Sequence, residues 1–228
     1  MKRILVLGLL LAVSGAAMAQ TEFRGRSVRL GFKLDPVFIN NLRPADNGLE
    51  KDGSKFGFSY GLMADFMFSD GRGAFASGIE VTHAAASLKY TDANKGLRRA
   101  EAAGAEQVYD IRLQYIQVPL SIKLKTNSNN GLRYWGQFGT YLGQLIGARA
   151  DWEYGSTSAT KQKILKDINP LNMGLLIGAG AEYHIAEKTD LFFGLGFENG
   201  FTDVTRNKKW NDGKVNLNRW ALRLGVFF

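Results

Sequence analysis

A strict two-residue alternation of side chains runs through this chain, and the segment 216–228 shows it most clearly. Large apolar residues occupy every second position at its end: Trp220, Leu222, Leu224, Val226 and Phe228. The positions between them include Arg223 and Gly225. Because successive side chains of a β-strand point to opposite faces, this pattern predicts a strand with one apolar face and one small or charged face.

Earlier segments share this alternation: 26–34, 55–68, 73–90, 107–125, 132–149, 171–186 and 189–201. Short connections alternate with long ones. The short ones are 69–72, 126–131 and 187–188, and the long ones are 35–54, 91–106, 150–170 and 202–215. Transmembrane barrels have this layout, with short periplasmic turns and longer extracellular loops. The sequence therefore predicts an all-β fold, an eight-stranded antiparallel transmembrane β-barrel with both chain ends on the periplasmic side.

The two faces of the predicted strands differ in chemistry. One carries Phe, Leu, Ile, Val and Tyr, and the other carries small residues and ions of both signs. Eight strands enclose only a narrow interior, so we expect the bulky apolar residues to face lipid. The expected lumenal charge network is Arg29, Asp65, Glu80, Lys123, Glu182, Glu198 and Arg223. Buried charges are costly unless paired, so we expect ion pairs that plug the lumen.

Two details of the strands carry further expectations. The apolar residues of segment 107–125 change parity between Tyr115 and Ile116, which predicts a β-bulge that keeps both sets on the outer face, with Pro119 near it. Aromatic residues near strand ends predict a girdle at each membrane interface. One girdle would contain Phe66, Phe68, Phe75, Tyr134, Phe193 and Phe228, and the other Phe56, Tyr90, Tyr109, Trp152 and Phe197.

Residues 1–19 have the layout of a secretion signal. A short basic start precedes an apolar run over 4–13, and residues 17–19 read Ala-Met-Ala, as at a signal peptidase site. The run is too short to span a bilayer as a helix. We therefore expect a signal peptide over 1–19, an outer-membrane β-barrel domain over 20–228, and export to a bacterial outer membrane.

The composition excludes several classes of site. The 228 residues include no cysteine, which excludes disulfides, thiolate metal sites and Cys nucleophiles. The net charge is +8, but the basic residues are scattered, so we expect no nucleic-acid partner. The two histidines, His83 and His184, lie on strands that are not neighbours, which argues against a shared metal site. We expect no metal, no cofactor and no catalytic residue.

Candidate sites occur on the last loop and on one strand. Arg206, Lys208, Lys209 and Trp210 form a basic and aromatic stretch of the last loop, which could contact lipopolysaccharide phosphates or a surface partner, or could be an ordinary solvated loop. His83 and Ser87 share one side of a strand, but no carboxylate can be assigned to them, so a polar residue near the outer interface is the preferred interpretation of His83.

The stretch from Tyr115 to Lys125 reads YIQVPLSIKLK and resembles a strand pattern of the PorT-like outer-membrane β-barrel family of Bacteroidetes, Y-I/L/V-x-I/V-P-L-x-I/L-K. Segments 177–183, 193–195 and 199–203 are also similar to that family. The resemblance covers essentially the whole chain after residue 19. It implies the fold and the outer-membrane location, and it implies no chemical activity.

The sequence thus predicts a non-enzymatic barrel with a structural or interaction role through its surface loops. The expected partners are outer-membrane lipid and lipopolysaccharide, together with an unidentified protein. Four alternatives stay open: a narrow channel, an accessory barrel of a secretion apparatus, a lipid A-modifying barrel enzyme, and a soluble secreted binding barrel.

Overall fold

The structure, a computed structural model, describes residues 28–45, 47–68, 71–99, 101, 106–186 and 189–228. The expected signal peptide lies outside these residues. The strands are β1 (Val28–Pro44), β2 (Leu49–Ser54), β3 (Gly57–Phe68), β4 (Gly73–Tyr90), β5 (Gln107–Lys125), β6 (Leu132–Tyr154), β7 (Thr157–Lys163), β8 (Leu171–Ala186), β9 (Thr189–Gly200) and β10 (Val215–Phe227), with a short helix α2 (Asn207–Trp210).

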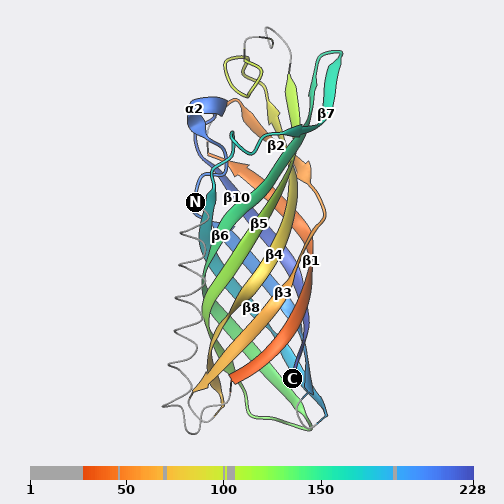
Figure 1. Cartoon of the computed structure of the whole chain (residues 1–228), viewed down its shortest axis with the longest axis vertical. Helices are drawn as coiled ribbons and strands as arrows, with labels where there is room; N and C mark the ends of the chain where they lie inside the picture. The colour runs from red at the N-terminus through yellow and green to blue at the C-terminus, as the bar shows by residue number, and fades with distance from the viewer. Residues whose placement is uncertain (1–27, 46, 69–70, 100, 102–105, 187–188) are drawn as a thin grey trace, which may run out of the picture.

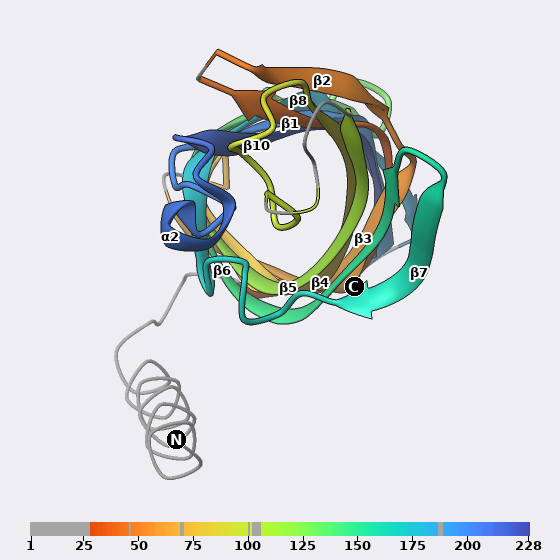
Figure 2. The same cartoon turned by 90° about the horizontal axis from the view of Figure 1, so that it is seen from above.

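Within the described residues, eight of these strands close into one antiparallel ring (Figures 1 and 2). The order around the ring is β1, β3, β4, β5, β6, β8, β9 and β10, and β10 pairs back onto β1. The predicted eight-stranded antiparallel barrel is confirmed. Among these residues, no helix has the length and apolar character needed to cross a bilayer.

The barrel has a short-turn end and a long-loop end. At the long-loop end, two predicted loops prove to be partly strand. β1 continues to Pro44 and β2 pairs with the end of β4, whereas β6 continues to Tyr154 and turns back as β7. The expectation that 35–54 and 150–170 are simple loops is therefore wrong. Strand pairing supplies hydrogen-bond partners for the backbone of these segments outside the membrane as well.

The orientation of the side chains is as predicted. Phe58, Leu62 and Phe66 of β3 are 39%, 53% and 44% exposed on the outer wall. Equivalent outward residues on the other strands form a continuous apolar belt, which includes Phe32, Ile79, Ile122, Phe138, Ile177, Leu195 and Leu222. An exposed belt of this kind indicates that the barrel is embedded in lipid.

The parity change in β5 has a different basis from the one predicted. β5 alternates without interruption, so Tyr109 and Tyr115 point inward together with Pro119, and the expected bulge between Tyr115 and Ile116 is absent. The register shift lies opposite, where Gln114 pairs with Gly147 but Tyr115 pairs with Leu145, so that Ile146 is the extra residue of β6. The inner face of β5 therefore changes from polar at the short-turn end to apolar at the long-loop end.

This change defines a second region of the interior, which we call the apolar cap. It is built from residues buried inside the long-loop end: Leu42, Leu49, Leu88, Tyr90, Tyr109, Ile111, Leu113, Tyr115, Trp152, Ile168, Trp210, Val215 and Leu217, among others. The prediction that Tyr90, Tyr109 and Trp152 belong to an outer aromatic girdle is wrong. Beyond the membrane the outside of the barrel meets water, so the apolar side chains turn inward there.

Candidate functional site

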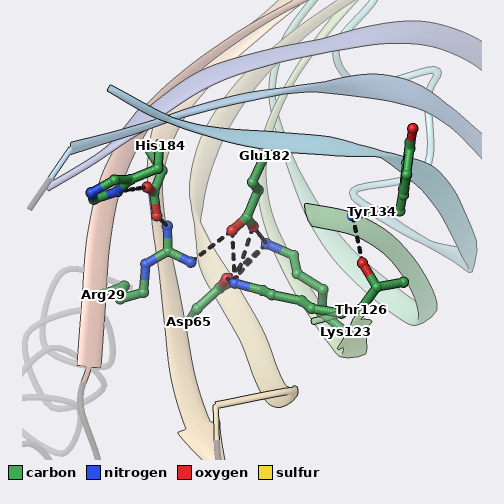
Figure 3. Close-up of polar contacts among 9 residues, drawn as sticks. Arg29, Asp65, Lys123, Thr126, Tyr134, Glu182 and His184 are labelled. Carbon is green, nitrogen blue, oxygen red and sulfur yellow. Dashed lines mark hydrogen bonds and ion pairs between the residues drawn. The ribbon is translucent and has the colours of Figure 1, made fainter. Parts of the chain in front are cut away.

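The lumen at the short-turn end holds a cluster of paired charges. Lys123 Nζ lies 2.8 Å from Asp65 Oδ2, and Lys125 Nζ lies 3.1 Å from the same oxygen and 3.0 Å from Glu182 Oε1. Arg29 Nη1 lies 2.8 Å from Glu182 Oε2, and its other terminal nitrogen pairs with Asp190. Figure 3 shows the side chains of Arg29, Asp65, Lys123 and Glu182 converging from separate strands.

Aromatic side chains line the space around this cluster. Lys123 Nζ lies 4.7 Å from the ring centroids of both Phe192 and Phe227. Trp135 stacks on Phe192 with a centroid distance of 4.6 Å. Ammonium groups are attracted to aromatic faces, most strongly where water is excluded, so these rings add to the stabilisation of the buried lysine.

A second cluster of charges lies nearer the middle of the barrel. Lys33 Nζ lies 2.9 Å from Asp35 Oδ2 and also pairs with Glu80. Glu198 pairs with Arg219 and with Arg223, the latter at 3.6 Å. Gln117 belongs to this cluster, since its Nε2 donates to Glu198 Oε2 at 3.0 Å and its Oε1 accepts from Arg219 at 2.7 Å.

All seven residues of the expected lumenal network, Arg29, Asp65, Glu80, Lys123, Glu182, Glu198 and Arg223, lie inside the barrel in these two clusters. The predicted network did not include Lys33, although its parity places it on the inner face, and it missed Asp35, Lys125, Asp190 and Arg219. Three of these could have been found from parity, since Asp35, Lys125 and Arg219 stand two or four positions from Lys33, Lys123 and Arg223 and thus share the inner face.

The lumen is nearly filled along its charged part. Two cavities among these residues have volumes of about 20 Å³ and about 10 Å³, each at most large enough for a single water molecule. A larger cavity of about 240 Å³ lies at the short-turn end and is lined by Arg29, Arg72 and Arg133. The charged side chains therefore neutralise one another instead of lining an aqueous path through the described part of the barrel.

The apolar cap closes the other end of the interior. Trp210 of α2 is fully buried, stacks on Tyr90 at 5.7 Å and meets Tyr109 edge-on at 5.0 Å. Its Nε1 donates a hydrogen bond to the carbonyl oxygen of Asp167 at 2.8 Å. Trp210 thus anchors the last loop across the barrel mouth, and the expectation that it belongs to an exposed tip is wrong.

The basic neighbours of Trp210 have different surroundings. Lys208 and Lys209 are exposed, whereas Arg206 is half-buried and its Nε donates to the carbonyl oxygen of Ile168 at 3.0 Å. Figure 2 shows α2 at the rim of the barrel opening. The surface that this loop offers consists of the two lysines beside an anchored arginine.

A buried carboxylate lies in the same loop. Burial raises the pKa of Asp212 to about 6, and the nearby charge of Asp203 acts in the same direction. The Tyr90 hydroxyl opposes this shift by donating to Asp212 Oδ2 at 2.8 Å. Burial also raises the pKa of Asp203. We therefore expect the stability of the apolar cap to depend on pH.

His83 and Ser87, the candidate catalytic pair, do not contact each other. The His83 ring stacks on Phe58 at 4.4 Å, on the outer wall. The Ser87 hydroxyl donates instead to Asp110. His184 Nδ1 lies 2.7 Å from Asp190 Oδ1 at the short-turn end. Across the described ranges no three His, Asp or Glu residues are arranged to hold a metal ion.

Comparisons with known proteins place these features in context. The family model described as outer membrane protein beta-barrel domain matches residues 18–206. No curated protein matches the chain.

Among solved structures, the chain is similar to Neisserial surface protein A with 16% identity and a TM-score of 0.47, covering 90% of this chain and 98% of that one. It is also similar to Ail of Yersinia pestis, with 14% identity, coverage of 90% and 99%, and a TM-score of 0.37. OprG of Pseudomonas aeruginosa shows 12% identity, coverage of 89% and 94%, and a TM-score of 0.42.

Proposed function

The chain belongs to the outer membrane protein beta-barrel domain family, and on that premise we propose that it is a non-enzymatic barrel whose extracellular end binds a partner. It is an outer-membrane β-barrel protein. By the usual arrangement of such barrels, the short turns lie in the periplasm and the long loops, with the apolar cap, lie outside the cell. Export through the sequence at 1–19 is part of this proposal.

One observation carries the proposal: side chains fill the barrel interior both within the membrane and at the extracellular end. Paired charges fill the membrane-level lumen, and the apolar cap fills the extracellular end. A narrow channel would need a continuous polar path, which this packing opposes. The useful surface of such a barrel is its outside and its extracellular end.

The arrangement of the polar residues also opposes enzymatic activity. A nucleophile needs a base within hydrogen-bond reach. Ser87 is bonded to Asp110 and His83 is stacked on Phe58, so neither activates the other. We propose that the protein performs no chemistry and requires no cofactor.

We assign the partner-binding role to the rim around α2. Lys208 and Lys209 are exposed there, and Trp210 holds the loop that carries them in one conformation. A pre-ordered loop loses less conformational entropy on binding than a mobile one. The partner would be a protein with an acidic surface, and the membrane lipids would surround the belt.

Photocrosslinking in living cells tests this role. A photoreactive residue at Lys209 should give a discrete crosslinked protein, whereas one at Arg72, in a short turn, should not give the same product. The proposal is overturned if the Lys209 position yields no adduct or the same adducts as Arg72. Steady single-channel conductance from the purified protein in a planar bilayer would overturn it as well.

We also propose membership of the PorT-like branch. The strand from Tyr115 to Lys125 supports it, because Pro119 points into the lumen between Gln117 and Ser121 at a position that few strands tolerate. A Pro119→Val variant should keep the fold if the proline is merely tolerated and should lose folding yield if it is a structural feature of the branch.

A further inference from the structure

The outer wall formed by β3, β4, β5 and β6 carries successive cross-strand rows of different chemistry. Tyr60, Val81 and Ile116 form one cross-strand row that belongs to the apolar belt. The next row outward contains Phe58, His83 and Gln114. Aromatic side chains concentrate where hydrocarbon meets headgroups. The second row therefore marks the extracellular membrane interface.

A row of cations follows, two residues further from the membrane. Arg112 of β5 pairs directly with Arg149 of β6, and Arg149 pairs directly with Lys163 of β7. Figure 2 shows β7 outside the ring beside β6. Directly paired residues share a face of the sheet, and two residues of strand span about 7 Å. The three cations thus lie side by side just beyond the aromatic row, where lipid headgroups are expected, along a line that runs obliquely to the membrane because barrel strands are tilted.

This cationic row is only partly neutralised by the protein. Arg112 pairs with Asp151, which stands in the next row outward opposite Asp110, and Asp110 pairs with Lys55. Arg149 and Lys163 form no ion pair with any described residue. Like charges directly opposite each other are destabilising unless an anion lies between them. The uncompensated charge lies on the membrane side of the acidic row.

A hollow in the wall lies between the aromatic row and the cationic row. Its volume is about 640 Å³, and its lining includes Phe58, His83, Arg112, Ile146 and Arg149. The hollow is open because its floor is formed by the small residues Ala85 and Gly147, and larger side chains at these positions would fill it. The hollow is thus apolar toward the membrane and cationic toward water.

We propose that this hollow binds a phosphorylated lipid of the outer leaflet, with an acyl chain against Phe58 and Ile146 and its phosphate on Arg149, beside which Lys163 stands on β7 just outside the hollow. Charge complementarity carries the assignment, because phosphate is the anion available at headgroup level and Arg binds it in a bidentate manner. The inference rests on the proposed outer-membrane role but concerns the side wall instead of the loop rim around α2.

Native mass spectrometry of the full chain in detergent micelles tests the site. The probes are bisphosphorylated lipid A and the same lipid with both phosphates removed. The wild-type protein should retain more of the phosphorylated lipid than of the dephosphorylated one. The double variant Arg149→Gln with Lys163→Gln should reduce this ratio by about fivefold per lost cation. The control pair Lys51→Gln with Lys166→Gln removes two exposed charges elsewhere and should preserve it.

A conservative pair, Arg149→Lys with Lys163→Arg, should retain the preference if charge is what binds. Equal retention of both probes by the wild type overturns the site, as does an equal loss in the Lys51 and Lys166 variant. Neither result touches the proposed loop-rim role, which is tested separately by the Lys209 and Arg72 crosslinks and by conductance measurements. A crosslinked wild type with no phosphate preference therefore refutes this inference alone.

Discussion

The Lys123 ammonium of β5 lies 2.8 Å from Asp65 Oδ2 of β3, although β4 separates these two strands in the barrel wall. The contact therefore spans the inner face of β4, where the small residues Ala74 and Ala76 leave room for it. Both side chains are almost fully buried. Because a buried charge without its partner is strongly unfavourable, this pair fixes the two strands at a set distance on the inner face of the wall.

Replacing Asp65 with Asn should destabilise the barrel by about 3–5 kcal/mol, the usual cost of breaking a buried ion pair. The substitution leaves Lys123 and Lys125 with Glu182 as their remaining anion. Equilibrium unfolding by urea in detergent micelles would measure the change.

The matched control for this prediction is Asp110→Asn. Asp110 also forms an ion pair, with Lys55, but on the water-exposed outer wall. Exposed pairs contribute about 0–1 kcal/mol. Equal losses of stability in the two variants would contradict the conclusion that the buried Lys123–Asp65 ion pair stabilises the barrel.

Trp210→Ala should loosen the extracellular loop without unfolding the membrane-embedded barrel. Deleting a buried Trp costs about 3–5 kcal/mol. We expect trypsin to cleave after Lys208 and Lys209 much faster, while the barrel keeps its heat-modifiable mobility in gels. Trp220→Ala, a change of the same size on the outer wall, should leave the cleavage rate unaltered.

The free-energy cost of an arginine on the outer wall should depend on its depth in the membrane. Leu120→Arg places a charge in the middle of the apolar belt and should cost about 2–4 kcal/mol, as at a bilayer midplane. Val108→Arg lies on the same face of β5 but beside Lys89 and Glu153, above the belt, and should be nearly neutral. Folding yield into lipid vesicles would compare them, and similar yields would place the membrane elsewhere.

The apolar cap should lose stability as the pH rises. Burial raises the pKa of Asp212 from 3.8 in the unfolded chain to about 6 in the folded one, so the folded state binds the extra proton. Stability therefore falls as pH increases from about 4 through 6 and then levels off. Hydrogen exchange of residues 203–215, corrected for intrinsic rates, should show weaker protection at pH 7 than at pH 5.

The variant Asp212→Asn is the control for this effect. It keeps an oxygen that can accept from Tyr90 but has no titrating carboxyl group. Protection in the variant should vary less with pH and should exceed that of the wild type at pH 7. A pH dependence as steep as that of the wild type would show that another group, such as Asp203, is responsible.

Much of the barrel wall was predictable because the alternation of its side chains is a local property of the sequence. The outward positions of Phe58, Leu62 and Phe66 follow from alternation alone, and so do the inward positions of Asp65 and Lys123. The parity change after Tyr115 was misassigned for a physical reason. A bulge in β5 and a change of its inner face from polar to apolar produce the same sequence pattern. The structure shows the change of face in β5, and the bulge lies in the partner strand β6 at Ile146.

By itself the sequence determined the fold class, the order of the eight barrel strands and the faces of the side chains within the membrane, because period-two alternation and turn spacing are properties of the chain within a few residues. Only the tertiary structure decided which ions pair inside the lumen, that Trp210 is buried, and that Arg112, Arg149 and Lys163 form one cross-strand row. These depend on the stagger between strands and on where the wall leaves the membrane, which no single segment encodes.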